Sequence, residues 1–256
     1  MSPTASAPLT GLVWTLVRTD FKTRYHGTLA GFLWALLKPL TMFLVLLGVF
    51  SFIFATDPAY KLNLIIGLFL WEFFAEATKV GLLSLSSKHY LLTKARFPSW
   101  ILVATSGSNA AITLAIFSAI IVGFLVLEGR PPGATALGLY LVYLALYGLI
   151  ALGFSLGASV LFLRYRDLNQ VWEVMIQAGF FVAPIIYPLA ILPERFHVYL
   201  YLWPPTMIIQ FSRAVLVDGL VPTPRAHLFL ALETAVILAV GALIFRRHAP
   251  RAAEYV

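Results

Sequence analysis

The chain has 256 residues, of which 61% are hydrophobic and 11% are charged, and its formal net charge is +7. Soluble domains contain about 25% charged residues, so this composition excludes an ordinary soluble protein. The basic residues flank hydrophobic runs instead of forming one patch, which argues against a nucleic-acid partner. The chain has no cysteine, which excludes disulfides and thiolate metal sites, and we predict no metal site.

Six long apolar runs follow one another along the chain. Each has about 20 residues or more, enough for a helix to cross a bilayer core of about 30 Å. No connecting loop is long enough to form a second domain. We therefore predict an all-α polytopic membrane protein whose single domain, residues 1–256, has six transmembrane helices at 28–55, 62–86, 100–127, 136–163, 170–192 and 226–245.

The distribution of basic residues predicts the orientation in the membrane. If the N-terminus is cytoplasmic and all six runs span, thirteen of the 18 Lys and Arg residues lie on the inner side. An excess of Lys and Arg marks cytoplasmic segments, so both termini are predicted to be cytoplasmic. The five cations left on the outer side are Lys61, Arg130, Arg195, Arg213 and Arg225.

Residues 9–25 precede the first run and place apolar residues at helical spacing. This pattern predicts an amphipathic helix that lies in the inner membrane interface, with its cations toward the headgroups. A cytoplasmic linker helix is the alternative. The residues assigned to this interfacial helix are Arg18, Lys22, Arg24 and Tyr25.

The second apolar run carries three charged residues. Glu72, Glu76 and Lys79 lie at i, i+4 and i+7, which places them on one helical face. Charges at this depth must face the bundle interior or water. Glu76 and Lys79 are also spaced to pair with each other. The two carboxylates are either structural hydrogen-bonding groups, which we favour, or a proton relay.

Two loop regions show further local structure. A short, basic, amphipathic helix is predicted over 88–97, ended by Pro98, and it suits docking onto another protein; a solvated charged loop is the alternative. Near the outer side, Pro184 and Pro188 are expected to break the fifth helix. Residues 193–217 are aromatic but too polar to span, so we predict two short re-entrant helices, with an interfacial aromatic belt as the alternative.

Several catalytic motifs are absent from the sequence. It has no G-x-x-x-x-G-K-[ST], and therefore no P-loop for ATP, and no G-x-S-x-G or H-E-x-x-H. The five histidines are scattered, and no carboxylate pair has a spacing specific for acid–base catalysis. We predict no catalytic residue and no cofactor in this chain.

The segment 18–40, RTDFKTRYHGTLAGFLWALLKPL, resembles the entry motif of ABC-2 type permeases that export polysaccharides, although Ala30 stands where Leu commonly precedes the glycine. The resemblance covers nearly the whole chain. Further resemblances follow in the expected order, in GLFLWEFFAEA, LLTKARFP, RYRDL, FVAPIIYP and AAEYV.

The resemblance implies a bacterial inner-membrane exporter. Two copies of the permease would form the pore, and two copies of a separate ATPase subunit would bind ATP and Mg. The substrate would be a lipid-linked glycan of the O-antigen, teichoic acid or capsule type. The helix at 88–97 would then be the coupling helix, with contacts to the ATPase from Lys88, His89, Leu91, Lys94, Arg96, Phe97 and Pro98.

Aromatic residues suggest a path for such a polymer, because sugar rings pack their C–H faces on aromatic rings, and weak repeated contacts allow passage. Packing within the bundle is the alternative for each ring. The candidate channel-lining residues are Trp34, Phe43, Phe73, Phe74 and Tyr187, and the outer gate would contain Pro184, Pro188 and Trp203.

Three other functions are considered. An ABC-2 permease for a small lipid or drug would share the architecture and differ in substrate. A proton-coupled carrier would use Glu72 and Glu76 and need no ATPase. An intramembrane transferase would need a carboxylate or histidine cluster at an interface, which the sequence does not provide.

Overall fold

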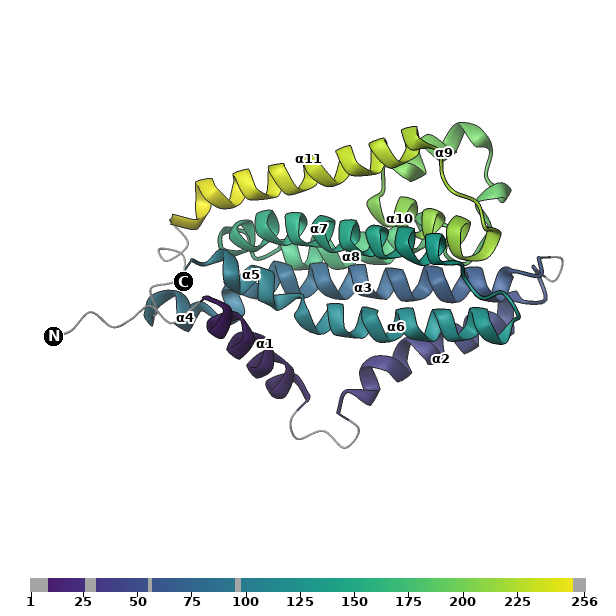
Figure 1. The fold of residues 1–256 in the computed structure, drawn as a ribbon. Coiled ribbons are helices and arrows are strands. Elements are labelled where there is room, and N and C mark those ends of the chain that lie inside the picture. The colour runs from purple at the N-terminus through teal and green to yellow at the C-terminus, as the bar shows by residue number, and fades with distance from the viewer. Residues whose placement is uncertain (1–8, 26–30, 55–56, 95–97, 251–256) are drawn as a thin grey trace.

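The computed structural model describes residues 9–25, 31–54, 57–94 and 98–250. Within these ranges the protein is all helical, with no strand (Figure 1). The α-helices are α1 (Leu9–Tyr25), α2 (Leu33–Phe50), α3 (Tyr60–Ser87), α4 (His89–Lys94), α5 (Trp100–Ser106), α6 (Ser108–Leu127), α7 (Ala134–Arg164), α8 (Leu168–Val182), α9 (Glu194–Tyr201), α10 (Pro204–Arg213) and α11 (Pro224–His248). A 3-10 helix, η1 (Leu189–Ile191), and a π-helix, η2 (Ala214–Asp218), complete the described elements.

The central element of the bundle is α3. Eighteen of its 28 residues are buried, and it contacts α2, α5, α6, α7, α8 and α10. Helices α6, α3, α7 and α11 lie side by side in that order (Figure 1). Helix α3 also carries Glu72, Glu76 and Lys79, and charged side chains in a membrane protein need partners from the protein or water, which favours a position among other helices.

Four stretches are long and apolar enough to cross a membrane: Leu33–Phe50, Trp100–Leu127, Ala134–Arg164 and Pro224–His248. They correspond to four of the six predicted spans. The second stretch, Trp100–Leu127, comprises α5 and α6, which meet at Gly107.

The other two predicted spans differ from single apolar helices. Helix α3 has the length, but every 18-residue window of it contains three charged residues. The predicted span 170–192 is not one continuous helix, because α8 ends at Val182 and a short 3-10 helix follows Pro188. Pro184 and Pro188 explain the interruption, since proline cannot donate a backbone hydrogen bond.

The predicted short helices are present in the structure. Helix α1 has the predicted bounds, and α4 forms within the predicted segment 88–97, of which residues 95–97 lie outside the described ranges. Within 193–217 the chain forms α9, α10 and most of the π-helix. Asp167 precedes α8, and its side chain accepts no capping hydrogen bond.

Small residues allow α7 and α11 to approach closely. A Cβ atom added at Gly153 would lie 2.7 Å from the Cα atom of Leu238 and 2.9 Å from its nitrogen. Because the obstacle is backbone, no side-chain rotation can relieve it. Small residues at such contacts are typical of helix packing in membranes, where close van der Waals contact drives association.

We expect Gly153→Val to destabilise the protein by about 1–3 kcal/mol, because the added side chain forces the two backbones apart. The measurement is the midpoint of thermal unfolding of the detergent-solubilised protein. Gly148→Val is the matched control, because a Cβ atom at Gly148, in the same helix, meets no atom within 4 Å. Equal midpoints for the two variants would contradict the proposed contact.

Candidate functional site

A buried arginine joins three segments of the chain where the helix is interrupted after α8. Arg213, the last residue of α10, is 5% exposed. Its Nη1 atom donates to the carbonyl oxygen of Pro184 at 2.6 Å, and its Nη2 atom donates to that of Ile185 at 2.9 Å. The carbonyl oxygen of Asn63, in α3, accepts from Nε at 2.9 Å and from Nη2 at 2.7 Å.

These bonds satisfy the carbonyl groups that follow the end of α8. A broken helix at membrane depth is tolerated only when its free backbone groups find partners in the protein. The planar guanidinium group presents several donors in a fixed arrangement, so it can bond several carbonyls at once. Arg213 therefore fixes the break after α8 to both α3 and α10.

The position of Gly67 makes room for this group. A Cβ atom at Gly67 would lie 2.5 Å from the Nη2 atom of Arg213.

Burial raises the pKa of the Asp218 carboxyl, Asp57 raises it further, and Arg213 and Arg130 oppose the rise. Neither of these carboxylates is within ion-pair distance of Arg213 among the described residues, and the hydrogen bonds of its guanidinium group go to backbone carbonyls.

The charged residues of α3 pair with other helices and not with each other. Glu76 accepts from Arg24 of α1, and Lys79 donates to Glu173 of α8 at 2.7 Å. The predicted pairing of Glu76 with Lys79 is therefore wrong. Each of the two side chains therefore bonds a different neighbouring helix, α1 for Glu76 and α8 for Lys79.

Glu72 lies in a small polar cavity of about 120 Å³. Lys38 of α2 and Asn109 of α6 line the same cavity, as do the paired Arg24 and Glu76. Glu72 and Glu76 thus line an internal cavity, whereas Lys79 lies outside it with 48% of its side chain exposed. Both environments agree with the expectation that these charges face the bundle interior or water.

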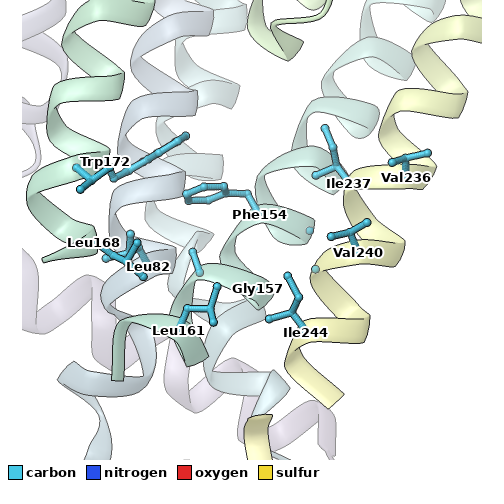
Figure 2. Close-up of a pocket in the computed structure, with 14 residues that line it drawn as sticks. Leu82, Phe154, Gly157, Leu161, Leu168, Trp172, Val236, Ile237, Val240 and Ile244 are labelled. Carbon is cyan, nitrogen blue, oxygen red and sulfur yellow. The ribbon is translucent and has the colours of Figure 1, made fainter. Parts of the chain in front are cut away.

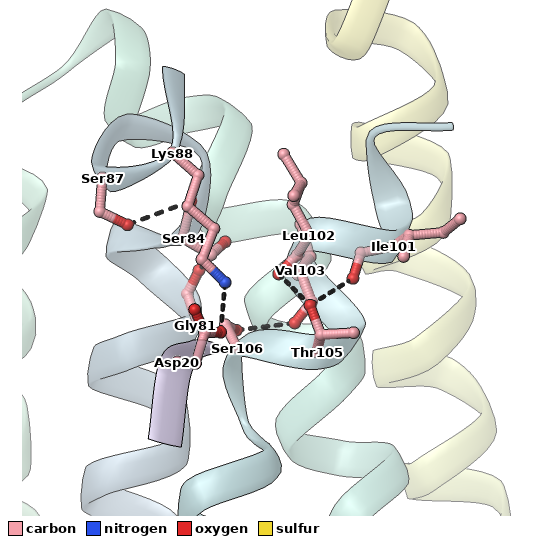
Figure 3. A network of polar contacts seen from close by, with 10 residues as sticks. All are labelled: Asp20, Gly81, Ser84, Ser87, Lys88, Ile101, Leu102, Val103, Thr105 and Ser106. Carbon is pink, nitrogen blue, oxygen red and sulfur yellow. Dashed lines mark hydrogen bonds and ion pairs between the residues drawn. The ribbon is translucent and has the colours of Figure 1, made fainter. Parts of the chain in front are cut away.

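Helix α1 is joined to the C-terminal end of α3. Asp20 forms an ion pair with Lys88, and these side chains are only 21% and 13% exposed (Figure 3). Leu16 packs into an apolar cluster with Leu85 and Ile101. Lys88 directly follows α3 and directly precedes α4, so this ion pair connects α1 to the start of the predicted coupling segment.

The remaining predicted coupling residues have varied environments. His89 is exposed, and its Nδ1 atom lies 3.1 Å from the carbonyl oxygen of Ser86. Leu91 packs against the apolar cluster of Leu16, and Pro98 is exposed before α5. The side chains of Lys94, Arg96 and Phe97 lie outside the described part of the chain. In α1, Arg18 and Lys22 are exposed and Arg24 is paired. The ring of Tyr25 contacts Phe21 in a tilted arrangement and Phe32 edge to face.

Most of the predicted channel-lining rings are packed within the core. Phe74 contacts four other rings, with centroid distances of 5.7 Å to Tyr147, 5.9 Å to Trp203, 6.0 Å to Trp71 and 6.1 Å to Trp172. We call these five residues the aromatic cluster. It joins α3, α7 and α8 to the start of α10, so Trp203, assigned to an outer gate, contacts Phe74, assigned to a channel.

The other rings fall into two environments. Phe73 also packs on Tyr147, and Phe43 packs on Phe124. Trp34, in contrast, is 62% exposed on α2. The hydroxyl group of Tyr187 donates to the carbonyl oxygen of Phe181 at 2.9 Å. Of the predicted gate prolines, Pro184 is buried beside Arg213 and Pro188 is half-buried.

Two buried or partly buried charged residues are not identified as site residues by the sequence patterns. Arg213 was counted only as an outer cation, although its place within the apolar segment MIIQFSRAVLV was a usable signal. Glu233 lies inside α11, and its Oε2 atom is buried with no hydrogen-bond partner among the described residues. Its position as a carboxylate within the last apolar run, 226–245, is the signal that could have identified Glu233.

Comparison with known proteins identifies the family. A family model for the ABC-2 type transporter matches residues 11–217. The chain belongs to the ABC-2 type transporter family. The match extends from α1 through the π-helix, so it includes the Asp20–Lys88 pair, the polar face of α3 and Arg213.

Related proteins match almost the full length of this ABC-2 transporter chain. The O-antigen export system permease protein RfbA of Myxococcus xanthus is 26% identical over 255 residues, covering 95% of each chain. An RfbA from Klebsiella pneumoniae is 27% identical, covering 95% of this chain and 94% of the relative. The polysialic acid transport protein KpsM of Escherichia coli is 22% identical, with 91% and 92% covered.

We expect Arg213→Gln to destabilise the protein by more than about 2 kcal/mol, because several buried carbonyls lose a charged donor. Gly67→Leu is expected to have a similar effect, because it displaces the guanidinium group while leaving the arginine in place. The measurement is the midpoint of thermal unfolding in detergent.

Arg225→Gln is the matched control for this prediction, because Arg225 is exposed in the first turn of α11. If Arg213→Gln unfolds at the same temperature as Arg225→Gln, the assigned structural role of Arg213 is incorrect.

Proposed function

We propose that this protein is the permease subunit of an ATP-driven exporter of lipid-linked polysaccharide. The observation that carries the proposal is the full-length similarity to permeases named for O-antigen export and polysialic acid transport. The substrate would be an O-antigen, teichoic acid or capsule type of glycan. The chain itself would be no enzyme.

The partner that supplies energy is proposed to be a separate ATPase subunit. The absence of a P-loop from the sequence supports this division of labour. Two copies of the permease and two of the ATPase would assemble, with ATP and Mg bound by the ATPase. This arrangement would place the permease in the bacterial inner membrane with both termini in the cytoplasm.

The six-pass topology belongs to the same proposal. Four passes would be made by the long apolar stretches, and α3 and α8 would contribute the other two. Helix α3 has the required length, and Glu76 and Lys79 are paired with Arg24 of α1 and Glu173 of α8. The segment that follows α8 would complete the pass that α8 begins. Helices α9 and α10 would then form the outer gate.

The coupling role is proposed for the segment that begins at Lys88. Movement of this segment by the ATPase would be transmitted to α1 through Asp20 and directly to α3, which Lys88 follows. A partly buried ion pair transmits displacement well because breaking it leaves charges without partners.

The proposed function is tested by reconstitution. Proteoliposomes that contain the permease and its co-encoded ATPase should move a lipid-linked glycan across the membrane when supplied with ATP and Mg. The permease alone should neither hydrolyse ATP nor transport. Transport by the permease alone under a pH gradient would support a proton-coupled carrier, and ATP-driven transport restricted to small lipids or drugs would support the other ABC-2 class.

The coupling proposal has its own test. Lys88→Glu and Asp20→Lys should each lower glycan export roughly tenfold, because each places like charges together, and a coupling of about 1.4 kcal/mol corresponds to a factor of ten. Combining both changes should restore most of the export. ATP binding by the complex should be unchanged in all three variants.

Lys22→Glu serves as the control, since Lys22 is exposed on the same helix and has no ion pair among the described residues. Failure of the double reversal to recover any export would exclude the Asp20–Lys88 pair as the transmitting contact.

A further inference from the structure

A wholly apolar groove opens between α7, α8 and α11. It has a volume of about 440 Å³ and is lined by fourteen residues, none of which carries a charge or a hydroxyl group (Figure 2). The one polar side-chain atom of the lining, Nε1 of Trp172, donates to Thr78 at 3.1 Å and so is already satisfied. The groove therefore suits a hydrocarbon chain and offers nothing to a polar ligand.

Two arginines lie one helical turn beyond the groove, on the faces that line it. Arg164 follows the lining residues Gly157 and Leu161 by seven and three positions in α7. Arg247 follows Val240 and Ile244 by seven and three positions in α11. Residues at these spacings share one face of a helix, so the groove and the two cations are aligned along the bundle.

Both arginines are available to a ligand. They are exposed, and neither forms an ion pair within the described ranges. Arg166 and Asp167 lie in the turn between α7 and α8, so one carboxylate and one further cation are also near this end of the groove. The local balance of Arg164, Arg166, Arg247 and Asp167 is positive.

We propose that this groove is a binding site for an anionic phospholipid of the surrounding bilayer. One acyl chain would occupy the apolar groove, and the phosphate would lie between Arg164 and Arg247. Basic residues at the membrane surface attract anionic lipids, and arginine binds phosphate with two parallel hydrogen bonds. On the proposed topology this lipid belongs to the inner leaflet.

Charge favours a lipid over a second copy of the chain. Helices α2 and α6, which expose apolar faces that a second copy could offer, contain no Asp or Glu. Helix α8 also exposes apolar residues, but its one carboxylate, Glu173, is already paired with Lys79. Such a helix would fill the groove but leave both arginines without a partner. A phospholipid supplies the chain and the anion together, and the site does not depend on the identity of the exported cargo.

The site is tested by native mass spectrometry of the full-length permease in mixed micelles with phosphatidylglycerol or phosphatidylcholine. The wild-type protein should retain phosphatidylglycerol preferentially. The double variant Arg164→Gln/Arg247→Gln should reduce that retention about tenfold, as two surface arginines contribute on the order of one factor of ten. Arg225→Gln/Arg246→Gln removes the same charge away from the groove faces and should retain the lipid.

Two further variants examine the groove itself. Ala158→Phe fills the groove and should reduce retention of both lipids, whereas Leu141→Phe, on an exposed part of α7, should not. Because the chain has no native cysteine, Val240→Cys reports contact between copies without background.

Three results would overturn the proposal. One is equal phosphatidylglycerol retention by the two double variants. Another is unchanged retention in a folded Ala158→Phe protein. The third is efficient disulfide cross-linking of Val240→Cys permeases in membranes, which would assign the groove to an interface between copies. Displacement of the lipid by inorganic phosphate alone would show that the headgroup and not the chain accounts for binding.

Discussion

The guanidinium group of Arg213 holds together the least regular part of this structure. It is buried, and the backbone carbonyls of Asn63, Pro184 and Ile185 accept its hydrogen bonds. An isolated cation at this depth would be costly, and so would free carbonyls at a helix break. Hydrogen bonds between the guanidinium group and these carbonyls offset the cost of burying each of them. They allow α8 to end at Val182 while the chain continues through α9 and α10.

The same arrangement connects the two ends of the bundle. Helix α3 accepts the bonds of Arg213 near its start and leads into Lys88, the partner of Asp20, at its other end. Its 28 residues correspond to a rigid rod of about 42 Å at 1.5 Å per residue. Under the proposed function, displacement of the segment after α3 would therefore be transmitted along α3 to the helix break after α8. The aromatic cluster packs midway along this helix.

The sequence predicted the elements well and their partners poorly. Apolar length located four spans, and helical spacing gave the bounds of α1, because these signals depend on a residue and its near neighbours. The partners of Glu76 and Lys79 depend on which helices flank α3, and local spacing favoured the wrong pair. Arg213 was missed for the same reason, since its carbonyl partners lie 28 to 150 positions away.

The buried rings constrain where a polymer path can lie. Phe43, Phe73 and Phe74 are 2%, 6% and 3% exposed, and they fill the space between helices within one copy. Opening a channel through that core would remove several large aromatic contacts, each of which stabilises the bundle. The exposed apolar side chains, among them Trp34 and Leu44 of α2 and Val174 and Phe181 of α8, lie instead on the outer surface. A conduit between two copies would break fewer buried aromatic contacts than one through the core of a single copy. Of the predicted lining residues, Trp34 already lies on an accessible face.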